Sequence, residues 1–313
     1  MIGDAGKPQI SPREPVFQLL DQKLQALKNP DRASLIFLGD NIYPKGLPDP
    51  ANQEKRQEAE KYLIEQLKII KNFSGRSFII PGNHDWAQGR KQGWQNAQNQ
   101  EAFINEFLDN DQVFQPTDAC AGPVEIALSP DLTLILINSQ WWFHQWDKPG
   151  IESDCEAKGD MDFLLLLKDA IERNKDKKVI IAAHHPLISN GSHGGYFPPS
   201  THLFPFGVKK KPIPLPILGS IYVGFRKYIG SVQDIPNVRY RQLRNYLFKL
   251  FKEHPHLTYV AGHDHNLQHH PQDNWHHIVS GSGSKITYIA KKKKADFAYA
   301  QKGFARLDYY DSG

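Results

Sequence analysis

Short apolar runs, each followed directly by polar side chains, recur along this chain and limit the folds that it can adopt. Leu35-Ile36-Phe37-Leu38 and Val179-Ile180-Ile181-Ala182-Ala183 are the clearest of these runs. Strands that are apolar at consecutive positions are buried on both faces, as in a sheet covered by helices. Helical patterns fill the intervals between the runs, which is typical of βαβ units. The sequence therefore predicts a mixed α/β fold with sheet inside and helices outside.

The residue patterns also place the expected elements along the chain. Strands are expected at residues 34–38, 77–80, 124–128, 132–138, 178–183, 257–261, 276–280 and 304–309. Helices are expected at residues 15–28, 53–72, 94–108, 160–174 and 240–254. We expect one domain over residues 1–313, with a long insertion at about 189–235. The insertion is rich in proline and glycine, which disfavours regular structure, and we expect it to act as a lid.

Composition narrows the classes of protein further. Hydrophobic residues make up 40% and charged residues 23% of the 313 positions, which is typical of a globular chain rather than a disordered one. The net charge of +4 is too small to predict a nucleic-acid partner, and the lysine runs 209–211 and 291–294 are more typical of solvated loops. The longest nearly apolar segment, residues 215–225, is too short and interrupted to predict a transmembrane helix.

Two features of the sequence bear on where the protein resides. The start, Met1-Ile2-Gly3-Asp4, resembles the end of a strand, so the chain could belong to a longer polypeptide. Cys120 and Cys155 are the two cysteines, and they either form one disulfide, which requires an oxidising compartment, or stay free.

Polar motifs follow the expected strands at their carboxyl ends. They are Gly3-Asp4, Gly39-Asp40-Asn41-Ile42-Tyr43, Gly82-Asn83-His84-Asp85, His184-His185 and Gly262-His263-Asp264-His265. The carboxyl ends of strands in an α/β sheet share one edge, where binding sites form. Carboxylates, an amide, a phenol and imidazoles together suit zinc, iron or manganese. There are too many for one tetrahedral site, but they suit two metals that clamp the oxygens of an in-line displacement at phosphorus.

These motifs, in this order, resemble those of the calcineurin-like metallophosphoesterase superfamily, and Tyr43 makes the chain most similar to purple acid phosphatases of the tartrate-resistant type. The resemblance implies a four-layer α/β/β/α sandwich with two mixed β-sheets. It also implies that Asp40 bridges two metal ions, favoured as Fe(III) with divalent Zn, Fe or Mn, whereas Mn or Zn pairs also fit. The implied ferric site is completed by Asp4, Tyr43 and His265, and the implied divalent site by Asn83, His184 and His263.

Further roles follow from the same resemblance. His84 would contact the phosphate and assist the leaving group, and Asp85 would hold the His84 tautomer. The spacing Ile181-x-x-His184 favours His184 over its neighbour His185 as the ligand. His193, nine positions after His184, would contact the substrate from the insertion.

The resulting functional hypothesis is a dinuclear phosphoesterase that hydrolyses small phosphate monoesters by in-line attack of a metal-bound hydroxide. One alternative is a phosphodiesterase or nucleotidase with the same metals, and another is a non-catalytic metal- or ligand-binding module. The resemblance to acid phosphatases and the two cysteines favour an extracytoplasmic location, periplasmic, secreted or at the cell surface. The aromatic cluster at residues 141–146 either packs in the core or forms a wall of the substrate pocket.

Overall fold

The computed structural model describes residues 1–207, 213–290 and 295–310. The lysine runs 209–211 and 291–294 therefore lie outside the described residues. No helix in the described ranges is long and apolar enough to cross a membrane.

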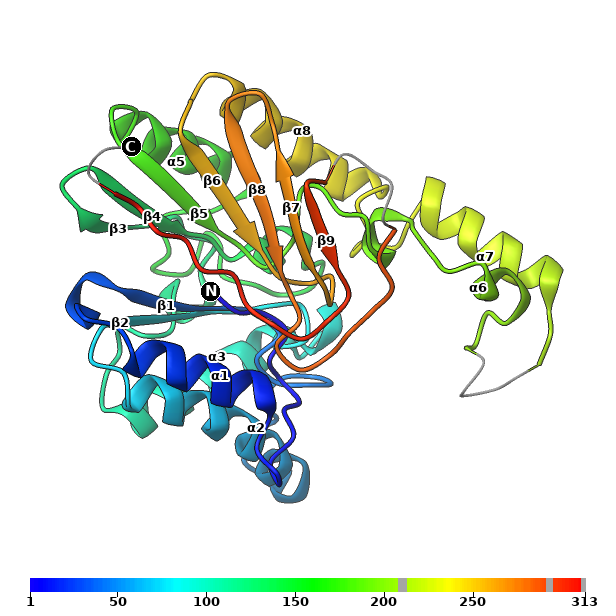
Figure 1. The fold of residues 1–313 in the computed structure, drawn as a ribbon, viewed down its shortest axis with the longest axis horizontal. Coiled ribbons are helices and arrows are strands. Elements are labelled where there is room, and N and C mark those ends of the chain that lie inside the picture. Colours follow the sequence, from blue (N-terminus) through cyan, green and yellow to red (C-terminus); the bar gives the residue numbers. More distant parts are fainter. Residues whose placement is uncertain (208–212, 291–294, 311–313) are drawn as a thin grey trace.

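The strands form two sheets that face each other (Figure 1). The smaller sheet pairs β1 (Ser34–Leu38) and β2 (Arg76–Ile80) in parallel, and single bridges join Ile2 to Phe37 and Phe114 to Ile79. The larger sheet is mixed and has the strand order β3-β4-β5-β6-β8-β7-β9. Its strands are β3 (Val124–Ser129), β4 (Leu132–Leu136), β5 (Lys178–Ala182), β6 (Leu257–Ala261), β7 (Leu267–Pro271), β8 (Trp275–Ser280) and β9 (Phe297–Tyr299).

Alternate side chains of each apolar run pack in different layers of the sandwich. In β1, Ile36 and Leu38 pack between the two sheets, whereas Leu35 and Phe37 pack beneath the helices. Alternate side chains of β4 and β5 likewise pack in two different layers, because neighbouring side chains of a strand point to opposite faces. Each run is therefore continuously apolar since both of its faces are buried, and the predicted four-layer α/β fold is confirmed.

Two groups of helices cover the outer faces of the sheets (Figure 1). The smaller sheet is covered by α1 (Pro15–Gln25), α2 (Gln53–Lys71) and α3 (Gly93–Leu108). The larger sheet is covered by α4 (Ser139–Phe143), α5 (Asp160–Arg173) and α8 (Val238–Lys252). The aromatic side chains of α4 are buried in this second core, so its Trp141, Trp142 and Phe143 pack in the core rather than line an open pocket.

The insertion differs from the expectation of irregular structure. It contains α6 (Ser200–Leu203) and α7 (Pro216–Tyr228), which project away from the two sheets (Figure 1). Proline at the first position of α7 is compatible with a helix because that N–H has no partner within the helix. The two ends of the insertion, near residues 189–195 and 231–235, lie against the strand ends.

Two further differences concern residues 304–309 and β7. Residues 304–309 were expected to form a strand, but no ladder forms there, and Leu307 and Tyr309 instead pack along the core between the sheets. Strand β7, with the sequence Leu-Gln-His-His-Pro, was not expected because it lacks an apolar run. It forms by antiparallel pairing with β8, which is a tertiary effect.

A disulfide joins Cys120 to Cys155, so the two cysteines are bonded to each other rather than free. It connects the segment before β3 to the segment before α5, so both ends of the bridge lie beside the large sheet. Both cysteines of the chain are used in this bond.

We predict that replacing both cysteines by serine lowers the free energy of unfolding by about 3–4 kcal/mol, because the bridge closes a loop of 35 residues and restricts the unfolded chain. Urea denaturation of the Cys120→Ser/Cys155→Ser protein measures this loss. A reductant should shift the wild-type curve towards that of the variant and leave the variant unchanged. A wild-type curve equal to that of the double variant without reductant would contradict the prediction.

Candidate metal centre

The polar residues that follow the strands meet at one edge of the sandwich. Asp40 follows β1, Asn83 follows β2, His184 follows β5 and His263 follows β6. Asp4 joins them because Ile2 pairs beside β1. Parallel strands place their carboxyl ends together, so each short loop delivers its side chain to the same region.

Asp4, Tyr43 and His265 form one cluster of ligand atoms. The Tyr43 hydroxyl donates to Asp4 Oδ1 at 3.0 Å and lies 3.1 Å from His265 Nε2. His265 Nε2 is 3.4 Å from Asp4 Oδ1. Burial, and then the charges of Asp4 and Asp40, raise the pKa of Tyr43 well above its ordinary value. Ionisation of this phenol therefore needs a cation beside it.

Asn83, His184 and His263 form a second cluster. Asn83 Oδ1 lies 3.0 Å from His184 Nε2 and 3.0 Å from His263 Nδ1, and these two nitrogens are 3.2 Å apart. The other ring nitrogen of each histidine faces a backbone carbonyl. His184 Nδ1 donates to Leu38 at 2.8 Å, and His263 Nε2 donates to Gln233 at 2.9 Å.

These two backbone bonds decide which nitrogens carry protons. When His184 Nδ1 and His263 Nε2 donate to carbonyls, the facing Nε2 and Nδ1 are lone pairs in the neutral rings. Both lone pairs converge with the Asn83 oxygen inside a buried space, and lone pairs at this separation repel one another. A cation at the point of convergence removes that repulsion, so the donor set fits a metal ion.

Asp40 lies between the two clusters. Its Oδ1 is 3.4 Å from His184 Nε2, and ligand atoms of Asp4, Asp40 and His184 lie within 4.8 Å of one another. Burial opposes ionisation of Asp40, but the nearby His184 and His84 rings outweigh it and lower the pKa of this carboxyl. Asp40 is therefore ionised, and its charge lies between the two clusters of candidate ligands.

Three residues of the clusters have a backbone conformation that is uncommon for residues other than glycine. Asp4, Asp40 and His263 have φ values of 57°, 54° and 70°, in the left-handed region. Such positions persist only where the surrounding structure holds them, and they concentrate at functional sites. Gly82 allows this arrangement, since a Cβ there would lie 2.3 Å from the Asp40 nitrogen.

His185 lies beside the second cluster but its ring is engaged elsewhere. Ser139 Oγ donates to His185 Nδ1 at 2.8 Å, and His185 Nε2 donates to Gln233 Oε1 at 2.7 Å. The ring also packs against Phe143 at 4.5 Å between centroids. With both nitrogens hydrogen-bonded, His185 supports the site from behind, which favours His184 as the ligand.

The structure contradicts the role expected for Asp85. His84 Nδ1 donates to the Pro44 carbonyl at 2.6 Å, so that backbone oxygen fixes the ring and turns Nε2 towards Asp40 Oδ2, 3.8 Å away. Asp85 instead accepts from the backbone N–H groups of Gly82, Asn41 and Ile42 at 2.7, 3.0 and 3.1 Å. Its buried carboxylate therefore ties the loop after β1 to the loop after β2, because both loops present N–H donors there.

His193 is brought to the site, as the spacing predicts. Its ring lies 3.8 Å from that of His263 between centroids, and its side chain remains 22% exposed. His193 Nδ1 donates to the buried Asp234 at 2.9 Å, and the His193 backbone N–H donates to Asp264 at 3.3 Å. Burial lowers the pKa of His193, but the bond to Asp234 and the charges of Asp264 and Asp234 outweigh it, so the pKa is raised.

Sequence reasoning missed the residues at the C-terminal end of the insertion that orient His263 and His193. Gln233 supplies the carbonyl that orients His263, and Asp234 binds His193 and also Arg226, at 2.6 Å to each carboxylate oxygen. No local pattern identifies them, because each acts on a residue some 30 to 41 positions away. Lys285, whose ammonium lies 3.0 Å from the centre of the Tyr43 ring, was missed too.

We predict that Asp234→Asn lowers the pKa of His193, because removing a negative charge destabilises the imidazolium beside it. A titration of the metal-free protein followed by the ¹H–¹⁵N signals of the His193 ring measures the change. Asp273→Asn, on an exposed turn, is the control for loss of one carboxylate. An unchanged His193 pKa in Asp234→Asn would assign the effect to Asp264 instead.

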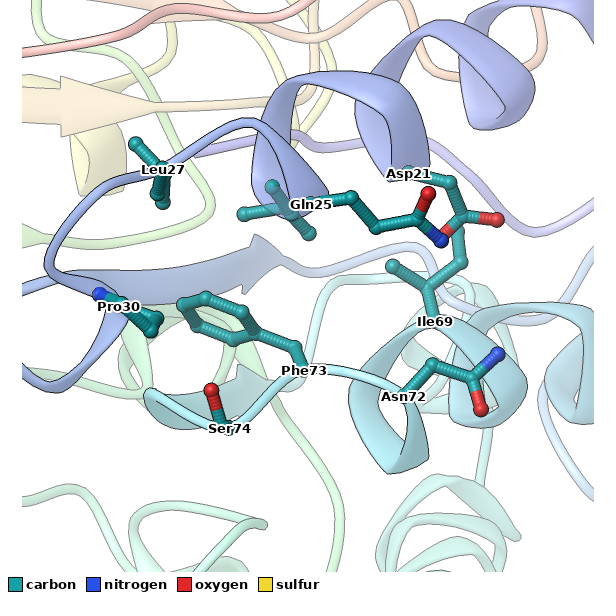
Figure 2. Close-up of a pocket in the computed structure, with 9 residues that line it drawn as sticks. Asp21, Gln25, Leu27, Pro30, Ile69, Asn72, Phe73 and Ser74 are labelled. Atoms are coloured by element: carbon teal, nitrogen blue, oxygen red, sulfur yellow. The ribbon is translucent and has the colours of Figure 1, made fainter.

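A separate pocket lies beside the ends of α1 and α2 (Figure 2). Pro30 and Ser74, which line it, precede β1 and β2, so the pocket is at the amino ends of these strands. Asp21 is its charged side chain, and Arg13 already pairs with it. The pocket is therefore at the opposite end of the strands from the metal-ligand clusters.

A four-layer sandwich with two clusters of candidate metal ligands on either side of one carboxylate is typical of the metallophosphoesterase class of protein. The sequence profile of the calcineurin-like phosphoesterase family matches residues 2–281. The chain belongs to this family, and the matched range contains every residue of the two clusters. No curated protein matches the sequence significantly.

Solved structures share the fold. GAP50, the anchor in the inner membrane complex of Plasmodium, is 20% identical, with a TM-score of 0.50 over 97% of this chain and 78% of that one. PhoD is 10% identical, with a TM-score of 0.56 over 92% of this chain and 60% of that one. At these identities the similarity concerns the fold alone, and the chemistry is argued from the residues of this chain.

Proposed function

We propose that this phosphoesterase is a dinuclear phosphomonoesterase of the purple acid phosphatase type. The observation that carries the proposal is that two clusters of ligand atoms, one with a tyrosine and one with an asparagine, meet on either side of Asp40. The first cluster would hold Fe(III), which prefers the oxygens of Asp4 and Tyr43, and the second would hold a divalent Zn, Fe or Mn ion. Bound metals would supply charge neutralisation and an activated water for in-line attack at phosphorus.

The chain's own residues would position the substrate around that centre. His84 presents Nε2 to the site while its Nδ1 donates to the Pro44 carbonyl, so Nε2 carries a proton only in the doubly protonated ring, and that form can give the proton to the leaving oxygen. His193 lies next to His263 of the second cluster, and its raised pKa favours the charged ring that would bind a phosphate oxygen. Asp234 keeps that ring oriented.

We predict that Asp40→Asn removes metal from both sites and lowers turnover of a small activated monoester by at least about 100-fold, because both ions lose a shared negative charge. Metal analysis of the purified protein, with phosphate release in parallel, measures both effects. Asp131→Asn, an exposed carboxylate in the β3–β4 turn, should change neither. Near-normal turnover with two bound metals would show that Asp40 is not the bridge.

We predict that iron-loaded protein is violet or pink and that Tyr43→Phe loses the colour, because a phenolate on ferric iron gives a charge-transfer band. Visible spectra at equal iron content measure the difference. Colour that survives in Tyr43→Phe would exclude this tyrosine as a ligand. A colourless wild-type protein with bound iron would contradict the ferric assignment and favour manganese or zinc.

The substrate class is tested by comparing phosphate monoesters with diesters and nucleotides on metal-reconstituted protein. The proposal expects monoesters to be hydrolysed faster. Comparable hydrolysis of diesters would favour the phosphodiesterase or nucleotidase reading. Absence of turnover with both metals bound would instead favour a non-catalytic binding module.

We further propose an extracytoplasmic location. The Cys120–Cys155 bridge supports it, because disulfides persist in oxidising compartments and are rare where thiols are kept reduced. Fractionation of the cells that produce the native protein, with the thiol state of the two cysteines measured in each fraction, tests the proposal. Recovery in the cytoplasm with reduced cysteines would refute it.

A further inference from the structure

Helix α7 carries a continuous apolar face that is exposed to solvent. At about 100° per residue, its large apolar side chains fall within about 140° of one another around the helix axis. Ile217, Ile221 and Tyr228 are 76%, 62% and 71% exposed. The other members are Leu218, Tyr222, Phe225 and the following Ile229, which are also exposed. Apolar side chains gathered on one surface in this way mark an interaction site.

The opposite side of α7 faces the protein, so the apolar face is turned outwards by packing. At Gly219 a Cβ would lie 2.1 Å from the His202 carbonyl oxygen of α6, which shows how closely the two helices approach. Val223 is buried on the same side. Arg226 pairs with Asp234, which ties the helix to the metal-centre end of the insertion. In Figure 1 the two helices project from the body of the molecule.

The insertion, residues 189–235, has an excess of positive charge. It contains five lysines and arginines and one acidic residue, Asp234, which pairs with Arg226. The Lys227 ammonium lies 5.4 Å from the centre of the Tyr228 ring, and three of the other cations, residues 209–211, lie outside the described residues. Aromatic and aliphatic side chains next to unbalanced positive charge complement a surface that is apolar inside and negatively charged outside.

We propose that α7 docks this protein on an anionic lipid surface, with the helix lying along the interface. The helix has 13 residues and is about 20 Å long, whereas the hydrocarbon core of a bilayer is about 30 Å thick, so it would lie in the interface. Tyr222, Phe225 and Tyr228 are suited to the headgroup region. A second copy of this chain is a poorer occupant, because a two-fold contact would bring the positively charged insertion against itself.

Co-sedimentation of the full chain with lipid vesicles tests the proposal. Vesicles of phosphatidylcholine alone are compared with vesicles of phosphatidylcholine and phosphatidylglycerol, at low and high salt. We expect binding to the anionic vesicles, weakened by salt, and at least a tenfold loss of binding in Ile221→Asp. Ile151→Asp is the matched control, because Ile151 is 84% exposed on a different segment and the charge change is the same.

Fluorescent labelling gives a second measurement that does not depend on a loss of binding. Ile221→Cys introduces a free thiol, because Cys120 and Cys155 are joined to each other. An environment-sensitive dye at this position should shift to the blue on anionic vesicles, whereas the same dye at Ile151→Cys should not shift.

Three outcomes would overturn the proposal. One is absence of binding to anionic vesicles, and another is equal binding of Ile221→Asp and wild type. The third is a concentration-dependent dimer in sedimentation velocity that Ile221→Asp abolishes, which would assign the face to a second copy. Thermal unfolding and hydrolysis of a small ester should be unchanged in Ile221→Asp, because this side chain is exposed on the outward face of α7 and takes no part in the metal centre.

Discussion

The rest of the site depends on the convergence of electron pairs at the carboxyl ends of three strands, β2, β5 and β6. Asn83 Oδ1, His184 Nε2 and His263 Nδ1 approach within 3.0–3.2 Å, and the protons of both rings are held on the far side by backbone carbonyls. In a buried space such an arrangement is unfavourable unless a cation occupies it. The fold therefore brings together a donor set that fits a cation at the point where the electron pairs meet.

Backbone groups, more than side chains, keep the ligands in place. The carbonyls of Leu38 and Gln233 fix two histidine rings, and the Pro44 carbonyl fixes His84. At Asp85 the roles are reversed, because the side chain accepts hydrogen bonds from backbone N–H groups. These donors belong to the two loops that carry Asp40 and Asn83. Because the backbone belongs to rigid strand ends, the ligand atoms have little freedom to separate even when no metal is present to attract them.

The sequence predicts the layers and the ligands because both are local. Apolar runs such as Leu35–Leu38 define buried strands, and each candidate ligand lies within a few residues of a strand end, so strand prediction also locates the site. What it cannot predict acts over long distances in the chain. Gln233 and Asp234 are recognised only once the insertion returns to the site, β7 forms only through its pairing with β8, and the Asp85 contacts depend on two loops meeting.

The insertion combines a polar end at the metal centre with an apolar helix at the surface, and Arg226 connects them. This guanidinium is part of α7 and holds both oxygens of Asp234, whose Oδ1 also orients His193. A rotation of α7 that separated Arg226 from Asp234 would leave a buried carboxylate with one cationic partner fewer, which is costly. Docking of the apolar face would therefore move the helix and the site as one unit. A substrate approaching along a lipid surface would meet the metal centre in a fixed orientation, set by a single buried ion pair.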